Sequence, residues 1–198
     1  MAGLKNGRWT EGAFASVAEY TALASFTAEA SLLQGVKSQP FIPAHHFDGN
    51  EGTGKSYTLL ASGILSSTGI PTYIFQWRLG TVASPTDLSG ASIGVSAAIA
   101  AAAGVTNKAW SSRLDVLVQT PGQGTGQTTI SAFGWVWSPG GFASPFEYPL
   151  EITTPDTATW TTTRDATVDN YFNLSVTCSA NSASNTIRCK QLQHWGNN

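Results

Sequence analysis

Residues 49–56, GNEGTGKS, carry the most specific chemical pattern in this 198-residue sequence. They match the phosphate-binding pattern G-x-x-x-x-G-K-[ST], in which backbone amides and the lysine hold phosphate oxygens and the hydroxyl binds Mg²⁺. Such a site needs an apolar strand before the loop and a helix after it. Here Pro43 and two histidines interrupt the preceding stretch, and residues 57–69 have no polar face of helical period. We therefore interpret residues 49–56 as a loop between strands that binds no nucleotide.

Histidines and carboxylates are further candidates for chemistry. His45 and His46 are adjacent, so in a strand they would point to opposite faces and could not hold one ion together. With Asp48 nearby, a metal site is the alternative to the solvated loop edge that this pattern favours. The carboxylates that could form a glycosidase pair lie in or beside predicted connections: Glu147, Glu151, Asp156, Asp165 and Asp169. The sequence therefore predicts no catalytic, metal-binding or cofactor-binding residue, and no cofactor.

Tryptophans near the middle of the chain suggest a different kind of site. Trp135 and Trp137 share one face of a predicted strand at 128–138, and with Trp160 they could form a platform on which sugars stack. The alternative is that these side chains pack in the core or in a subunit interface, which we favour. The sequence leaves both possibilities open.

The two cysteines, Cys178 and Cys189, flank the polar stretch 179–188. In a hairpin centred on residues 183 and 184 they would lie opposite each other, so a disulfide is geometrically possible. Synthesis in a reducing cytoplasm favours two buried thiols instead. Their spacing gives no reason to expect a metal site.

Composition narrows the class of protein. The chain is 41% hydrophobic and only 11% charged, with a formal net charge of −2. The abundant aromatic residues and the low net charge argue against a disordered chain. Acidic residues outnumber basic ones, 12 to 10, which argues against nucleic-acid binding through bulk charge. No stretch of the sequence has the roughly 18 uninterrupted apolar residues of a membrane span.

Alternation with a period of two dominates the sequence after residue 40. It is clearest at 73–79, 110–118 and 172–178, where every second side chain is mostly apolar. Short strands separated by Gly, Pro, Asn and Ser turns predict an all-β fold, a jelly-roll β-sandwich. Residues 93–104 are rich in alanine and fit either a short helix or a buried strand.

The first 27 residues lack this alternation. We therefore divide the chain into an extended or partly helical N-terminal arm, residues 1–27, and a jelly-roll domain, residues 28–198. Aromatic residues spread thinly along the arm cannot cover one another, so we expect a partner to bury them: Trp9, Phe14, Tyr20 and Phe26. The alternative is that this segment simply opens the same domain.

Several stretches from residue 40 onward resemble jelly-roll virion proteins of tailed bacteriophages. The resemblance is carried by ASGILSSTG at 61–69, RLG at 78–80, WSSRLD at 110–115 and SASNTI at 182–187. It covers about residues 28–195 and leaves out residues 1–27. It implies a jelly-roll fold and a role as a capsid decoration protein, a head fibre or a tail-associated receptor-binding part. Such proteins are commonly homotrimers.

Our leading hypothesis is a non-enzymatic capsid decoration (cement) protein. It would be made in the host cytoplasm and bind the capsid exterior as a homotrimer, through the major capsid protein or another virion protein, with no membrane or nucleic-acid partner. The alternative is a tail- or fibre-associated protein that binds a receptor or carbohydrate. An enzyme, either a nucleotide hydrolase or a polysaccharide depolymerase, comes third. The arm favours the first hypothesis, whereas exposed aromatic residues clustered in one loop region would favour the second.

Overall fold

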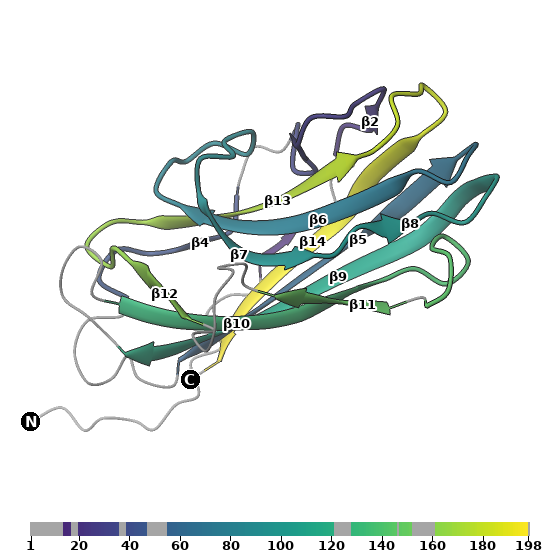
Figure 1. Cartoon of the computed structure of the whole chain (residues 1–198). Helices are drawn as coiled ribbons and strands as arrows, with labels where there is room; N and C mark the ends of the chain where they lie inside the picture. Colours follow the sequence, from purple (N-terminus) through teal and green to yellow (C-terminus); the bar gives the residue numbers. More distant parts are fainter. Residues whose placement is uncertain are drawn as a thin grey trace, which may run out of the picture.

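The computed structural model describes residues 14–16, 20–35, 39–46, 55–120, 128–145, 147–151 and 161–197, and strands run through this part of the chain (Figure 1). No helix occurs among these residues, so the predicted all-β class is confirmed, while the narrower jelly-roll assignment stays a prediction. It follows that none of the described segments is a helix able to span a bilayer. The strands are β1 (Phe14–Ser16), β2 (Leu23–Ala24), β3 (Ala30–Ser31), β4 (Phe41–Ile42), β5 (Ser56–Ser67), β6 (Thr72–Gly80), β7 (Ala91–Ser96), β8 (Ile99–Ala100), β9 (Val105–Thr120), β10 (Thr128–Trp137), β11 (Glu147–Glu151), β12 (Thr161–Arg164), β13 (Asn170–Cys178) and β14 (Thr186–Asn197).

The strands join into one hydrogen-bonded sheet that folds over on itself. Its order is β1-β14-β5-β9-β10-β11-β7-β6-β13-β3, and the four remaining strands pair alongside this path. The sheet curls into a nearly closed, barrel-like sandwich, in which β6, β7 and β13 lie over β5, β9 and β14 (Figure 1). The long strands β5, β9, β10 and β14 therefore form one continuous outer face.

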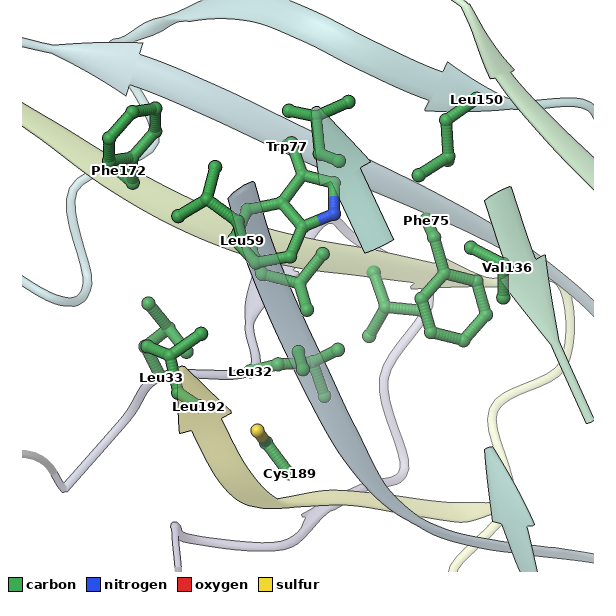
Figure 2. Packing of buried hydrophobic residues seen from close by; sticks show 14 of the residues in the cluster. Leu32, Leu33, Leu59, Phe75, Trp77, Val136, Leu150, Phe172, Cys189 and Leu192 are labelled. Carbon is green, nitrogen blue, oxygen red and sulfur yellow. The ribbon is translucent and has the colours of Figure 1, made fainter. Parts of the chain in front are cut away.

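The period-two alternation read from the sequence decides which side chains fill the interior. In β6, the aromatic side chains Tyr73, Phe75 and Trp77 are all fully buried, and the residues between them are partly exposed. The indole N–H of Trp77 donates a hydrogen bond of 2.9 Å to the hydroxyl of Ser112 in β9. Because β6 and β9 are not neighbours in the sheet, this bond crosses the interior of the sandwich. Figure 2 shows Trp77 among the aliphatic side chains of this core.

Residues 20–35, which we call the seam segment, bridge the two ends of the curled sheet. Its first strand, β2, pairs with β14, and its second, β3, pairs with β13. Leu32 and Leu33, just after β3, are fully buried and pack into the core (Figure 2). The segment therefore covers the seam between β13 and β14. The predicted arm boundary between residues 27 and 28 falls inside it, and residues 1–13 and 17–19 of the predicted arm lie outside the described residues.

Other local predictions have mixed outcomes. The ambiguous residues 93–104 contain no helix: residues 93–96 belong to β7, and residues 99–100 form β8. The predicted hairpin that would place Cys178 opposite Cys189 is wrong, because Cys178 faces Tyr73 of β6 and Cys189 faces Gly63 of β5, whereas the favoured interpretation of two buried thiols is confirmed. The connection between β13 and β14 passes from one end of the curled sheet to the other, so the two strands are not neighbours. Both thiols are free and buried.

Candidate functional site

The phosphate-loop pattern leads into a strand. Residues 49–54 lie outside the described residues, and Ser56 begins the twelve-residue strand β5 where a nucleotide site would need a helix. Lys55 donates a hydrogen bond of 2.9 Å from its ammonium to the backbone carbonyl of His46. The described end of the pattern is therefore the start of a strand, and the absence of nucleotide binding stays a prediction.

The histidines pack with aromatic rings. His46 meets the ring of Tyr57 edge-on at 5.7 Å, and on the other side Tyr57 stacks on His194 at 5.6 Å. His194 is almost fully buried, and burial, with a smaller effect of His46, lowers its pKa to about 4. Asp48 lies outside the described residues. In the part of the chain that the structure describes, no three His, Cys, Asp or Glu side chains gather as a metal site would require.

Two of the sequence-derived carboxylates accept hydrogen bonds from backbone amides in turns. Asp165 accepts a hydrogen bond from the backbone N–H of Thr167 at 2.9 Å, and Asp169 accepts one from the backbone N–H of Ala44 at 2.8 Å. Glu147 is exposed at the start of β11. The side chain of Glu151 and all of Asp156 lie outside the described part.

The aromatic residues predicted to bind a partner have different surroundings. Tyr20 is 2% exposed and belongs to the core of this chain, and Phe26 is partly buried against the same core. The backbone of Phe14 pairs with His194 of β14, but its side chain is outside the description, as is all of Trp9. Two of the four residues thus cover the chain's own interior, and whether any of them contacts a partner stays a prediction.

A different set of aromatic side chains lies on the outer surface of β10. Inward and outward residues alternate along this strand, so Phe133, Trp135 and Trp137 share its outer side. Phe133 is 53% exposed, Trp137 is 41% exposed and Trp135 is partly buried. Soluble proteins seldom expose a contiguous apolar patch, and such patches generally mark binding surfaces. The row of three rings therefore makes the outer side of β10 a candidate binding surface.

Polar side chains line both sides of these rings. The strand register places Asp115, Arg113 and Ser111 of β9 opposite Phe133, Trp135 and Trp137. On the other side, β11 places Pro149 opposite Trp135 and Glu147 opposite Trp137. We call this surface of β9, β10 and β11 the aromatic face.

The polar groups on the β9 side are held by a chain of contacts. Thr58 of β5 donates a hydrogen bond of 2.6 Å to the Asp115 carboxylate, which also forms an ion pair of 2.9 Å with Arg113. The Arg113 guanidinium lies 5.1 Å from the ring centre of Trp135, a cation–π distance. Because this ion pair is well exposed, it contributes little to stability. Its main effect is to fix Arg113 over Trp135.

A groove adjoins one end of the aromatic face. It has a volume of about 430 Å³, within the range of ligand pockets, and its lining includes Leu117, Ser131 and Phe133. Ser56 and Gln119 add a hydroxyl and an amide. The side chains of Ser56, Gln119 and Ser131 have no hydrogen-bond partner among the described residues. The groove thus combines apolar walls with polar side chains.

Gly134 permits the close contact between β9 and β10 at the centre of the face. A Cβ atom at this position would lie 2.0 Å from the backbone carbonyl oxygen of Arg113. No other residue type fits there without moving one strand, so glycine keeps Arg113 and Trp135 in register.

Sequence reasoning found part of this site. The outward orientation of Trp135 and Trp137 argues against the core packing that the sequence favours, and it leaves a platform or a subunit interface open. Trp160, the third candidate, lies outside the described residues, and the third ring is Phe133. The spacing 133, 135, 137 was the signal that could have identified it. Arg113 and Asp115 were missed because their position beside the rings depends on the pairing register of β9 and β10.

Comparisons with known proteins add little. No protein-family model and no curated protein matches the chain. Among solved structures, the chain is similar to the CBM2 module of Lactobacillus casei BL23 phage J-1 evolved Dit, with 9% sequence identity and a TM-score of 0.32. The match covers 81% of this chain and 68% of that one. A likeness at this level carries no argument about function.

Proposed function

We propose that this protein is a non-enzymatic bacteriophage virion protein, associated with the tail or a fibre, that binds a receptor through its aromatic face. The virion assignment rests on the resemblance seen in the sequence. The binding role rests on one observation: Phe133, Trp135 and Trp137 lie in a row on the outer side of β10, beside a groove. Clustered exposed aromatic residues favour receptor binding over capsid decoration, although the cluster lies on a strand and not on a loop.

Capsid decoration as a homotrimer on the capsid exterior remains the alternative. It depends on an N-terminal arm that grips a capsid protein. Of the residues expected to do so, Tyr20 and Phe26 pack against this chain's core, which weakens the support for an anchor at these positions. Trp9 lies outside the described residues, so the first part of the arm keeps this alternative open.

Labelling of intact virions tests the proposal. A gold-labelled antibody against the protein should mark the tail or its fibres, whereas a capsid decoration protein would be labelled over the head. An excess of purified protein should also slow adsorption of the phage to its host. The F133A/W137A variant should compete much less well. Absence of labelling, or equal competition by the variant, would overturn the proposal.

A further inference from the structure

The aromatic face has the dimensions of a site for an extended ligand. From Phe133 to Trp137 the strand advances four residues, or about 13 Å at the usual rise of a β-strand. The groove extends the surface beyond Phe133 towards Ser131. An occupant lying along β10 would therefore contact several side chains in succession.

We infer that the aromatic face binds a neutral polysaccharide, with sugar rings stacked on Phe133 and Trp137. This inference rests on the proposed receptor-binding function and names the chemical class of the receptor. Three features of the face support it: the exposed ring faces, the polar groups beside them, and the charge of the surface.

The exposed rings supply the stacking surfaces. The two faces of a pyranose ring carry C–H bonds with a slight positive charge, and the face of an aromatic ring carries the negative part of its quadrupole. Phe133 and Trp137 are the two most exposed rings of the face, at 53% and 41%. Trp135 lies between them with Arg113 held over it, so its role is to support the guanidinium.

The polar groups match the hydroxyls at the rim of a sugar. Arg113 carries several N–H donors, while Asp115 and Glu147 offer carboxylate oxygens. In the groove, the hydroxyl of Ser131 and the amide of Gln119 have no hydrogen-bond partner among the described residues. The aromatic face therefore offers rings on which the apolar faces of a sugar chain can stack, and donors and acceptors that can bond the hydroxyls at its rim.

The charge of the face favours a neutral ligand over two other occupants. Arg113 is neutralised by Asp115, and Glu147 forms no ion pair among the described residues, so the face has no excess positive charge for an anionic polymer. A second copy of this chain would bury Glu147 against a face on which Arg113 is already paired with Asp115. Burying an unpaired carboxylate is costly, whereas sugar hydroxyls can hydrogen-bond it.

The test uses the full chain and three variants. W137A and F133A/W137A remove stacking surface, and F41A removes an aromatic side chain that is also 41% exposed but lies on β4. Electrophoresis through gels containing hydroxyethylcellulose, xylan, mannan, dextran or soluble β-1,3-glucan measures retention, and sedimentation measures binding to cellulose and chitin. Each assay is repeated from about 50 mM to about 500 mM NaCl, because added salt weakens binding that depends on exposed charges. Thermal unfolding confirms that every variant folds.

We expect at least one polysaccharide to retain the wild-type protein and F41A equally, with little effect of salt. W137A should weaken binding about tenfold, which corresponds to about 1.4 kcal/mol, and F133A/W137A should abolish it. The inference is overturned if no polysaccharide is bound, if F133A/W137A binds normally, or if salt abolishes binding. A dimer in light scattering that W137A dissociates would assign the face to a second copy and also overturn it. Absence of the protein from virions would refute the proposed function alone and leave the binding result intact.

Discussion

Arg78 of β6 donates two hydrogen bonds of 2.7 Å each to the Glu29 carboxylate of the seam segment. The same guanidinium donates to the carbonyl of Gly90 at 2.7 Å, and the hydroxyl of Ser175 in β13 also donates to Glu29. Both charged side chains are largely shielded from solvent. This ion pair therefore fastens the N-terminal part of the chain to the body of the sandwich.

Replacement of Glu29 by Gln should lower the free energy of unfolding by about 1–2 kcal/mol, because the guanidinium loses its charged acceptor. Asp115→Asn provides the matched control, since the ion pair between Asp115 and Arg113 is much more exposed and should contribute less. Urea denaturation near neutral pH measures both. Equal losses for the two variants would contradict a special role for the seam ion pair.

The Glu29 ion pair should also affect stability in acid. Burial alone would raise the pKa of Glu29, but the hydrogen bonds from Arg78 and Ser175 and the charge of Arg78 hold it below its ordinary value of 4.5. The ion pair therefore stabilises the fold fully above pH 4.5 and loses this effect as the pH falls through the lowered pKa. Wild-type protein should lose its stability advantage over E29Q in that range, which thermal unfolding at several pH values would reveal.

His194 should produce a second pH dependence at higher pH. Its pKa falls from about 6.5 in the unfolded chain to about 4 in the fold, mainly because it is buried. Between these values the unfolded chain binds more protons, so stability decreases as the pH falls from about 6.5 to about 4, by about 3 kcal/mol in total. His194→Gln should remove this slope. An unchanged slope in the variant would show that another group is responsible.

The strands that bury one face could be predicted from the sequence because alternation is a local property. Residues 73–79, 110–118 and 172–178 point their predicted side inward. The sequence did not predict that β2 and β3 connect the two ends of the curled sheet, because a strand of two residues is too short to show alternation. What defines them is pairing with β14 and β13, more than 140 residues later in the chain.

The candidate site was likewise predictable only where it depends on alternation within one strand. The outward position of Trp135 and Trp137 follows from alternation within β10, whereas Arg113 and Glu147 come from β9 and β11. Their arrival beside the rings depends on strand order and register, which one sequence does not reveal. The predicted cysteine hairpin is wrong for the same reason. Cys178 lies in β13, which pairs with β6, and Cys189 lies in β14, which pairs with β5.

The hydrogen bond from Trp77 to Ser112, which crosses the interior of the sandwich, should stabilise the fold. Ser112→Ala leaves a buried indole N–H without its acceptor, which costs about 1–3 kcal/mol. In a Trp77→Phe background the same change should cost clearly less, because the donor is gone. Chemical denaturation of the four proteins in this cycle measures the difference. Equal costs in both backgrounds would mean that the bond itself contributes nothing.

The most direct measurement of the binding role is fluorine NMR of protein labelled with 5-fluorotryptophan, with Trp→Phe variants assigning the signals. Soluble oligosaccharides of cellulose, chitin, mannan and β-1,3-glucan are added in turn. We expect a bound oligosaccharide to shift the signal of Trp137, on which a sugar ring stacks, and to leave those of the buried Trp77 and Trp110 unchanged. A binding response confined to other tryptophans, or no shift with any oligosaccharide, would contradict it.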